Sequence, residues 1–535
     1  MRIRKKVLAG ILIMALCTNV GLAEGSIAKG MVKEGQNTIL MQQSEKKTEK
    51  DTSEETKMTD SQGLVYEPYR DDEGEVTDEN LLQVSAGKLK TGKIVVPETF
   101  QGKKVMAVAW RGFYGCKKLT SITLGSNIEL ISSNAFANCV NLSEVKIDKA
   151  ATTYIGEAAF EKCTSLKKIK LPKKLAGLSF SVFASSGLEE IIIPNSVRNI
   201  WDYVFQDCKQ LKKVTLGKKL RGIGHNCFEG CTALKEIVIP KKTEYLREEA
   251  FLGCENLNKV IFKGKLEEIG KDAFAKTPFK EKEKDGEYCI VNGLMIETYG
   301  EIKGNLLING KKKINGKKVR GISGTAYANN KKIKKLTIKN IERITGHAFE
   351  NCKADICEVQ NIKEMSYYAF YGGKIDKIKV KKIKKLDECF VEAAVKEFYA
   401  SDIGKCGYEG IPRNVRKIVM DGIKKKGEIP NLRVQKKLKE AIIRGNISEI
   451  PSERLEFCTS LKTLTIETPL ELQWTHRPWD YEWFTGCEKL KDVYIKAGKV
   501  NGTISGVFSK DITLHVPEEQ IEIYKEYVDC KVVAW

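Results

Sequence analysis

The fold is decided by a phrase that reads, in one of its copies, Ile155-Gly-Glu-Ala-Ala159-Phe160-Glu-Lys-Cys163-Thr-Ser-Leu166-Lys-Lys-Ile169-Lys-Leu171-Pro172. The phrase recurs at a short fixed period, which is the signature of stacked coils. The residue before each phenylalanine is usually small, which suggests that the chain turns inward there. We expect the phenylalanines to form one apolar spine. They fall 22 to 24 residues apart, at Phe113, Phe136, Phe160, Phe183, Phe205, Phe228, Phe251 and Phe274.

The end of each phrase predicts a β-strand. In Leu166–Leu171 and Leu234–Ile239, apolar residues alternate with polar ones, which is the period of a strand with one buried face. A coil of about 23 residues cannot bury its own apolar side, so its strand must pair with the strands of the coils before and after it. The sequence therefore predicts an α/β-type repeat solenoid with a continuous parallel sheet on one face.

Cysteine follows most of these phenylalanines by three residues. Equivalent residues of adjacent coils would lie about 4.8 Å apart, which a disulfide could span. Their side chains point the same way, however, and this disfavours the bridging dihedral angle. Buried free thiols that satisfy backbone groups of the turns are therefore favoured, with disulfides as the alternative. The predicted ladder consists of Cys116, Cys139, Cys163, Cys208, Cys231, Cys254, Cys352, Cys458 and Cys487.

The N-terminus predicts export. Basic residues precede an apolar run from Val7 to Cys17, and the small residue Ala23 follows, so we expect residues 1–23 to be a signal peptide. Residues 24–62 are rich in charged and small polar residues, and we expect a disordered tether there. No later stretch approaches the roughly 18 to 20 apolar residues of a membrane-spanning helix. A secreted or surface-associated protein is the expectation.

The repeat lapses after Phe274. Between Gly286 and Ile314 the sequence reads as short strands separated by Asn-Gly turns. This pattern predicts a hairpin insertion over residues 280–321. It would separate an N-terminal sub-array with its cap, residues 63–279, from a C-terminal sub-array, residues 322–535.

A second departure covers residues 391–455, where the phenylalanine and cysteine signals largely vanish. Strand-like pieces nevertheless persist at 395–398, 417–420 and 440–443. We therefore expect these degenerate coils to continue the array, giving about 18 coils in all. A last strand and a short helix near Leu514–Tyr524 predict a C-terminal cap.

Positive charge is concentrated in one window. The chain has 91 Lys and Arg against 70 Asp and Glu, a formal charge of +21, and residues 303–340 contain no acidic residue. Such density predicts a patch for an anionic polymer, such as an envelope polymer or acidic glycan, and not for specific nucleic-acid binding. The alternative is that these lysines only keep an exposed edge soluble. The candidate residues are Lys311, Lys312, Lys313, Lys317, Lys318, Arg320, Lys331 and Lys332.

An aromatic cluster marks one enlarged coil. Its flanking strand centres, Leu464 and Val493, are 29 residues apart, so about six extra residues leave the solenoid as a loop. Aromatic residues beside arginine are typical of a contact hot spot or a sugar-stacking platform. The alternative is local core, because Phe484 keeps the position of the repeat phenylalanine. The candidate contact residues are Trp474, Arg477, Trp479 and Tyr481.

Chemistry-bearing motifs are scarce. With four histidines in the chain, there is little material for a metal site or a catalytic set. Cys289, Cys357 and Cys406 lie outside the thiol ladder, but no nucleophile–base motif, phosphate loop or metal-ligand spacing accompanies them. We therefore expect a non-catalytic protein without cofactor or metal.

The repeat phrase resembles the BspA-like leucine-rich-repeat family of bacterial surface proteins, from about Lys93 to the end of the chain. The resemblance implies a leucine-rich-repeat solenoid that binds host proteins, glycans or anionic envelope polymers, since family members are associated with adhesion to extracellular matrix and with co-aggregation. The alternative is a structural envelope component that self-assembles or caps another surface protein. The repeated residues themselves indicate a core and do not identify a partner.

Overall fold

The computed structural model describes residues 57–71, 75–76, 78–147, 151–300, 302–407, 410–413, 415–451, 454–475, 484–499 and 507–535. The predicted signal peptide and most of the predicted tether lie outside these ranges. The described residues belong to two compact units. Unit 1 covers the chain up to residue 220 together with residues 230–237, and unit 2 covers residues 221–229 together with 238–535. The division into sub-arrays at residues 280 and 321 stays a prediction.

Strands are the main regular secondary structure of both units. The strands of unit 1 are β1 (Met58–Thr59), β2 (Leu64–Pro68), β3 (Leu81–Ala86), β4 (Lys93–Val95), β5 (Thr99–Phe100), β6 (Lys103–Val108), β7 (Ser121–Thr123), β8 (Leu130–Ile131), β9 (Glu144–Lys146), β10 (Tyr154–Ile155), β11 (Glu190–Ile192), β12 (Asn199–Ile200) and β13 (Lys213–Thr215). β15 (Glu236–Ile239) contains a boundary between the units.

Unit 2 has longer strands and two α-helices among its described residues. Its strands are β14 (Gly222–Ile223), β16 (Tyr245–Leu246), β17 (Lys259–Phe262), β18 (Glu268–Ile269), β19 (Lys284–Asp285), β20 (Tyr288–Val291), β21 (Leu294–Thr298), β22 (Gly304–Asn309), β23 (Lys313–Ile314), β24 (Lys317–Lys318), β25 (Gly321–Ile322), β26 (Ile333–Lys339), β27 (Arg343–Ile344), β28 (Lys353–Met365), β29 (Lys374–Leu386), β30 (Ala394–Cys406), β31 (Lys417–Glu428), β32 (Glu440–Pro451), β33 (Thr463–Glu471), β34 (Gln473–Thr475), β35 (Asp492–Lys499), β36 (Thr513–Val516) and β37 (Lys531–Ala534). The helices are α4 (Pro278–Glu283), the 3-10 turn η5 (Glu518–Gln520) and α5 (Ile521–Lys525).

Antiparallel strands begin unit 1. β1 pairs with β2, and β2 pairs with β3. Asp60 holds the first turn, because its Oδ1 atom accepts hydrogen bonds of 2.9 Å from the backbone N–H groups of Gln62 and Leu64. The tether predicted over residues 24–62 is therefore too long, since the chain is already paired at β1. An aspartate-stabilised turn is a local feature that average composition does not reveal.

The sheet that the sequence predicts as continuous is divided into short ladders in unit 1. β4, β7 and β9 pair in parallel, and so do β11 and β13. The six residues Leu166–Leu171 form no strand, contrary to the prediction, although Ile169 and Leu171 are buried. Alternation of apolar residues therefore predicts which side chains enter the core. It does not ensure that the backbone aligns well enough for a hydrogen-bonded ladder.

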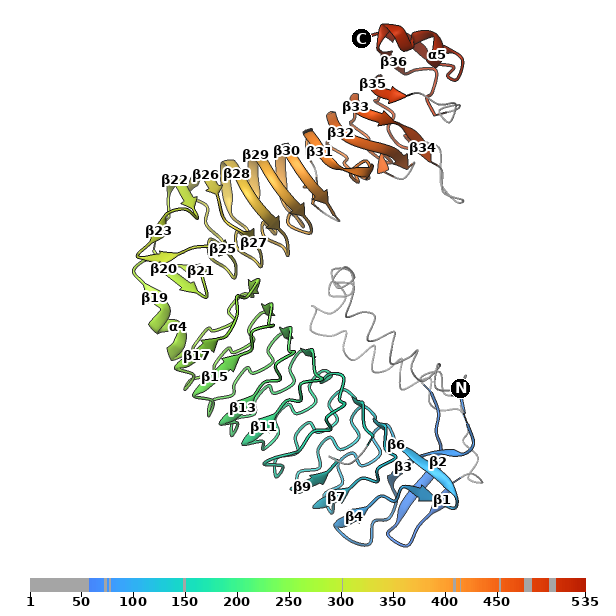
Figure 1. Ribbon diagram of the computed structural model, residues 1–535, viewed down its shortest axis with the longest axis vertical. Helices are drawn as coiled ribbons and strands as arrows, with labels where there is room; N and C mark the ends of the chain where they lie inside the picture. Colours follow the sequence, from blue (N-terminus) through green and yellow to red (C-terminus); the bar gives the residue numbers. More distant parts are fainter. Residues whose placement is uncertain are drawn as a thin grey trace. The chain divides into compact units, whose positions relative to one another are not determined.

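One sheet of 17 strands, from β19 to β37, runs through most of unit 2. Apart from the antiparallel pairs β19–β20 and β20–β21, each strand pairs in parallel with its counterpart in the next coil. Figure 1 shows β26, β28, β29, β30 and β31 side by side in chain order. The strand pieces predicted at 395–398, 417–420 and 440–443 lie inside β30, β31 and β32. The chain is a β-solenoid of about 18 coils with about 23 residues each.

The long strands of unit 2 turn a corner midway. β28, β29 and β30 each have 13 residues. A left-handed residue lies inside each of them, namely Asn361 (φ 57°), Lys382 (φ 58°) and Asp402 (φ 57°). The Nδ2 atom of Asn361 donates to Oδ1 of Asn340 at 2.8 Å, and Nδ2 of Asn340 donates to Oδ1 of Asn309 at 3.1 Å. Asparagine tolerates left-handed backbone, and here its amide also continues the ladder through the side chains.

Turns, not helices, form the return side of each coil. In the described residues only α4 and α5 are α-helical, so the α/β-type designation is too strong. Left-handed residues stand two positions before and after the spine phenylalanine, as Glu249 (φ 54°) and Gly253 (φ 67°) do around Phe251. The backbone N–H of Phe251 donates to the carbonyl of Ala273 in the next coil at 2.8 Å. A small residue precedes most of the phenylalanines because the backbones of adjacent coils are in direct contact there.

Within each unit the phenylalanines form the predicted apolar spine. The ring centroids of Phe113 and Phe136 lie 5.1 Å apart, and those of Phe228 and Phe251 are also 5.1 Å apart with only 3° between the ring planes. Burying one such side chain contributes about 1.5–3 kcal/mol. The parallel stack ends at Phe274, where Phe279 of α4 packs edge-on at 5.0 Å.

The ladder cysteines are free thiols, and seven of the nine have a defined acceptor in the described residues, which agrees with the favoured alternative. Sγ of Cys139 donates to the carbonyl of Phe113 at 2.9 Å, and Sγ of Cys254 donates to the carbonyl of Phe228 at 3.0 Å. All 15 cysteines of the described part are free. Burial raises the pKa of the Cys139 thiol to about 12, so the proton needed for the hydrogen bond stays on sulfur at neutral pH.

An intervening segment, residues 278–318, separates the coil of β18 from the coil of β25. It comprises α4 and the strands from β19 to β24. β20 and β21 pair antiparallel around the turn Asn292-Gly293, where Asn292 is left-handed (φ 50°). β21 then pairs in parallel with β25, and β22 with β26. The segment is therefore joined to the same sheet as the coils that follow it.

Side chains of unit 2 connect the coils on either side of the intervening segment. Nη1 of Arg343 lies 3.0 Å from Oε2 of Glu267, and Nε2 of His347 lies 2.8 Å from Oε1 of Glu248. The guanidinium of Arg247 also lies over the ring of Tyr367, at 5.2 Å from its centroid. We call the contacts Arg343–Glu267 and His347–Glu248 the clasp.

Candidate binding surfaces

The eight residues of the predicted basic patch lie at four places in unit 2. Lys311 and Lys312 are exposed in the turn between β22 and β23, and exposed Lys313 begins β23. Lys317 and Lys318 form β24, which pairs antiparallel with β23. The other three residues are Arg320, directly before β25, and Lys331 and Lys332, directly before β26. The patch is therefore not one continuous run on a single element.

The side chains of Arg320 and Lys317 bond to groups of the protein. Nε of half-buried Arg320 donates to the carbonyl of Asn292 at 3.0 Å, and its Nη2 atom donates to the carbonyl of Leu266. Nζ of Lys317 lies 3.1 Å from Oε2 of Glu283. Arg320 holds the intervening segment against the preceding coil. Lys311, Lys312, Lys313, Lys318 and Lys331 are exposed and can face a partner.

A lysine-lined hollow of about 510 Å³ opens at the start of β26 and β28. We call it the lysine hollow. Five ammonium groups and one carboxylate surround it, and all six side chains are exposed. Such a surplus of like charge in a concave surface raises the local concentration of anions. The lining residues are Lys303, Gly304, Lys331, Lys332, Ile333, Lys334, Lys353 and Asp355.

Backbone hydrogen bonds fix where these lysines stand. The N–H of Gly304 donates to the carbonyl of Lys332 at 2.9 Å, and the N–H of Lys353 donates to the carbonyl of Asn330 at 2.8 Å. In the next coil, Lys374 is the direct partner of Lys353 in the register of β28 and β29. Lysines thus recur at the same edge of successive coils, and adjacent strands of a sheet lie about 4.8 Å apart.

The outward face of the sheet differs, because its charges are paired. Nζ of Lys377 lies 2.7 Å from Oε2 of Glu397, and Nζ of Lys417 lies 2.7 Å from Oε2 of Glu440. The hydrogen bond from Lys377 lowers the pKa of the Glu397 carboxyl. Cross-strand pairs of opposite charge stabilise a sheet, so these lysines have a structural partner. In the described part of the chain no carboxylate lies within ion-pair distance of Lys331, Lys334 or Lys353.

A row of uncharged side chains runs along the same outward face, between the paired charges. The strand registers align Tyr399 with Val419, Val419 with Ile442, and then Thr465, Tyr494 and His515. All six are half-buried. The rings of Tyr494 and His515 stack at 4.1 Å. We call this set the central row. Aromatic and aliphatic groups ringed by charge are the composition of a protein contact surface.

Trp474 is a core residue, so the contact role predicted for it is wrong. β34 pairs in parallel with β32, which turns the indole inward. The side chain is 5% exposed, and its ring lies 5.3 Å from Phe508 and 6.0 Å from Phe484. The other three candidates of the aromatic loop, Arg477, Trp479 and Tyr481, lie outside the described residues.

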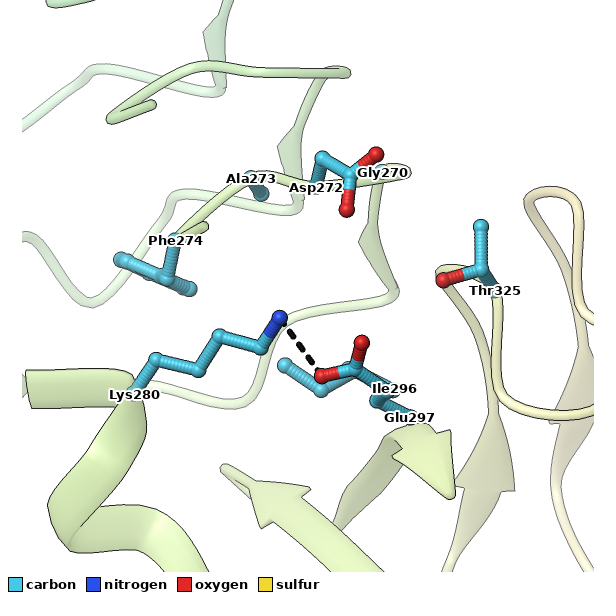
Figure 2. A pocket seen from close by; sticks show the side chains of 8 residues that line it. All are labelled: Gly270, Asp272, Ala273, Phe274, Lys280, Ile296, Glu297 and Thr325. Atoms are coloured by element: carbon cyan, nitrogen blue, oxygen red, sulfur yellow. Dashed lines mark ion pairs between the residues drawn. The ribbon is translucent and has the colours of Figure 1, made fainter. Parts of the chain in front are cut away.

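A small enclosed space lies where α4 meets the sheet. It holds about 10 Å³, roughly one water molecule. Figure 2 shows Lys280 of α4 pointing at Glu297 of β21, with Nζ and Oε2 at 2.5 Å, beneath Asp272 and Thr325. Glu297 also accepts a hydrogen bond of 2.7 Å from the hydroxyl of Tyr299. Both charges are satisfied locally, so the space is part of the joint between the intervening segment and the coils.

Cys289, Cys357 and Cys406, which lie outside the ladder, are poor nucleophiles. Burial raises the pKa of Cys289 and of Cys406 to about 12, and it also raises the pKa of Cys357 well above its usual range. The thiolate is the reactive form of cysteine, so these groups stay protonated and unreactive at neutral pH.

Sequence reasoning missed Lys303, Lys334 and Lys353 as neighbours of Lys331 and Lys332. A count of charge along the chain favours runs of adjacent lysines, such as 311–313. The useful signal is the coil period, because a lysine stands 21 residues after Lys332 and again 21 residues after Lys353. Aligning the coils with one another reveals this column of lysines, whereas counting charge in a sliding window along the chain does not.

One family model matches most of the repeat array. The BspA type leucine rich repeat region matches in 6 copies, over residues 94–201, 177–283, 313–404 and 433–515. A leucine-rich-repeat protein of T. pallidum is 28% identical over 39% of this chain and 91% of its own, with a TM-score of 0.33. One from Bacteroides ovatus is 18% identical over 88% and 98%, with a TM-score of 0.34.

A leucine rich cell surface protein from Faecalibacterium prausnitzii is 20% identical over 78% of this chain and 95% of its own, with a TM-score of 0.34. No curated protein matches the chain. Among the described residues, no helix is both long enough and apolar enough to cross a bilayer. The repeat phrase, the phenylalanine spine, the thiol ladder and the match over more than half of the sequence agree, and the chain belongs to the BspA-type leucine-rich-repeat family.

Proposed function

We propose that this protein is a secreted or cell-surface-associated, non-catalytic binding protein. Proteins of this repeat family typically bind other proteins. The predicted signal peptide, residues 1–23, supports export. In this proposal the outward face of the sheet in unit 2 is presented to a partner protein or glycan of the host or of a neighbouring cell, and adhesion is the result.

The central row is the observation that carries the proposal. A solenoid needs a buried face for each coil, but nothing in its packing requires uncharged side chains on the solvent face. Tyr399, Ile442 and Tyr494 are nevertheless aligned there by the register of their strands. Lys417–Glu440 and Arg444–Glu467 pair beside them, at 2.7 Å and 2.6 Å. Because these charges are already neutralised, a partner can bury the row without leaving an unpaired charge.

Binding to an array of extracellular-matrix proteins and glycans, measured at two salt concentrations, tests the proposal. We expect at least one ligand whose binding survives the higher salt. The double variant Ile442→Ser with Tyr494→Ser should weaken that binding by about 30-fold, as for hot-spot residues. The matched control is Ile192→Ser, because Ile192 is 69% exposed on β11 and lies outside the row. Equal losses in both variants, with both folded, would contradict the proposal.

Two further measurements address location and the structural alternative. Fractionation of cells that produce the full chain should recover the protein outside the cytoplasmic membrane, with residues 1–23 removed. Sedimentation velocity over a range of concentrations should give one species of constant size. Growth into larger assemblies with concentration would instead favour a self-assembling envelope component.

A further inference from the structure

We propose that the lysine hollow is a second binding site, separate from the central row, and that its ligand is a linear polymer of phosphate or sulfate esters. The polymer would cross the strands and meet lysines of successive coils. This inference does not depend on the proposed function, because it concerns another edge of the sheet and a ligand of different chemistry.

The first step is the charge of the site. Lys331, Lys334 and Lys353 are exposed, and among the described residues Asp355 is the one acidic residue that lines the hollow. On the outward face a few residues further along the same strands, Lys335 is 2.8 Å from Glu358. Lysines of this region therefore do pair where a carboxylate is available. At the hollow, Lys331, Lys334 and Lys353 have no carboxylate within ion-pair distance among the described residues, and an external anion would supply the missing charge.

The second step is the kind of anion. A lysine ammonium is a compact point charge, which suits the tetrahedral oxygens of phosphate and sulfate, whereas planar carboxylates are matched better by the guanidinium fork of arginine. The lining of the hollow contains no arginine and no aromatic ring. Nucleic-acid bases would find no stacking platform there. The chemistry thus favours a polymer with charged esters and no bases.

The third step is the repeat. Lys353 and Lys374 stand opposite each other in the register of β28 and β29, and such strands are about 4.8 Å apart. A polymer that runs along the stack contacts one lysine of this column in each coil. A single small anion contacts the lysines of one coil only. Each contact releases counterions from the polymer, so affinity grows with the number of lysines engaged and falls with salt.

The experiment uses the folded chain without residues 1–23 and four probes: long-chain inorganic polyphosphate, whose phosphate oxygens stand in for those of a phosphate ester, dextran sulfate, poly-L-glutamate and poly(dT). We expect polyphosphate, dextran sulfate or both to bind more tightly than polyglutamate at equal charge concentration, and the comparison of the first two distinguishes phosphate from sulfate. The variant K331Q/K334Q/K353Q should bind the preferred ester about tenfold or more weakly at low salt. Its slope of log K against log salt should fall by about 2.

The matched control is K173Q/K174Q/K218Q, which removes the same charge from exposed lysines of unit 1. It should bind the ester as the parent protein does. A third variant, K311Q/K312Q/K313Q, removes the three lysines that follow β22. Its loss of affinity for the polymer should be smaller than that of the hollow variant. Thermal melts establish that each variant is folded.

Three outcomes would overturn the proposal. Equal weakening in the hollow variant and in the unit 1 control would mean that net charge alone holds the polymer. Polyglutamate binding as tight as that of the esters would remove the selectivity. Binding of poly(dT) as tight as polyphosphate, lost in the same variant, would make the hollow a nucleic-acid surface. The central-row variant should leave ester binding unchanged, so the two sites succeed or fail separately.

Discussion

Nε2 of His347 lies 2.8 Å from Oε1 of Glu248, although the whole intervening segment separates the two residues in sequence. Nδ1 of the same ring is 3.1 Å from Oε2 of Glu350, and the ring stacks on Tyr368 at 5.7 Å. Nζ of Lys271 lies 3.6 Å from Oε2 of Glu350. The imidazole therefore sits between two carboxylates, one from each side of the segment.

This geometry predicts a pH dependence of unit 2. Burial lowers the pKa of His347, but the hydrogen bond and charge of Glu248 outweigh it, so the pKa lies above the ordinary value of about 6.5. A raised histidine pKa stabilises the fold fully below the ordinary value, and this contribution disappears as pH rises through the raised pKa. Burial raises the pKa of Glu248, but the hydrogen bond from His347 outweighs it, so that pKa is lowered. The contribution of Glu248 to the stability of the fold therefore disappears only when the pH falls through its lowered pKa.

Replacing His347 by Gln tests this dependence. We expect a loss of about 1–2 kcal/mol near pH 6, because a charge-assisted hydrogen bond is removed. The fall in melting temperature of the parent protein above about pH 6.5 should be absent in the variant. Titration of the histidine resonances by NMR gives the pKa directly, and the chain has four histidines to assign. A parent protein whose melting temperature is flat between pH 6 and 8 would contradict the prediction.

The thiol ladder predicts the cost of losing one sulfur. Cys254→Ala should destabilise unit 2 by about 1–3 kcal/mol, because the carbonyl of Phe228 loses its donor inside the core and a small cavity remains. Cys254→Ser keeps a donor and should lose less. Cys116, the first and half-buried member, is the control, since its thiol donates to no acceptor in the described residues. Denaturant melts of the variants measure the differences.

Burial of the thiols also predicts slow chemistry. The raised pKa values, about 12 for Cys352 as for Cys139, keep sulfur protonated at pH 8. We expect a soluble disulfide reagent to label the native mature protein slowly, with half-buried Cys116 and Cys406 reacting first. Unfolding in guanidinium should expose the other thiols to the reagent at once. Rapid labelling of the native protein, or an intact mass that reveals disulfides, would be incompatible with a ladder of enclosed thiols.

The corner of the long strands predicts a stabilising substitution. Lys382 adopts φ 58° directly above Asn361 in the stack. A lysine pays a steric penalty in this conformation that asparagine largely avoids. Lys382→Asn should therefore raise the stability by about 0.5–1 kcal/mol, and its amide can extend the ladder from Asn361. Lys381→Asn is the control, because Lys381 is equally exposed and does not have positive φ. Calorimetry should find no gain in stability for Lys381→Asn.

The sequence predicts the repeating core well. The spacing of Phe228, Phe251 and Phe274 requires equal coils, and a cysteine three residues later can reach only the turn of the preceding coil. The coils of 391–455 were recoverable for the same reason, because their strands keep the period even without the phenylalanine. These are short-range patterns repeated many times, so a coil whose own pattern is weak can still be predicted from the spacing of its neighbours.

Features that occur once were not predictable in this way. The clasp joins His347 to Glu248 across a segment of irregular length, and no period relates the two. The sequence predicts a loop at Trp474 because β34 has only three residues, too few to give a recognisable alternation of apolar and polar residues. The lysine hollow depends on which lysines share an edge of the sheet, and this requires the register of β22, β26 and β28.

The nearest-neighbour bonding of the coils has a consequence for how the gene can change. Each ordinary coil gives its backbone and thiol hydrogen bonds to adjacent copies that offer the same acceptors, so duplicating or deleting one whole coil leaves no donor stranded. Lineages are thus free to lengthen or shorten the array in single steps. The coils between Glu248 and His347 are exempt from this freedom, because the clasp fixes how many of them there must be.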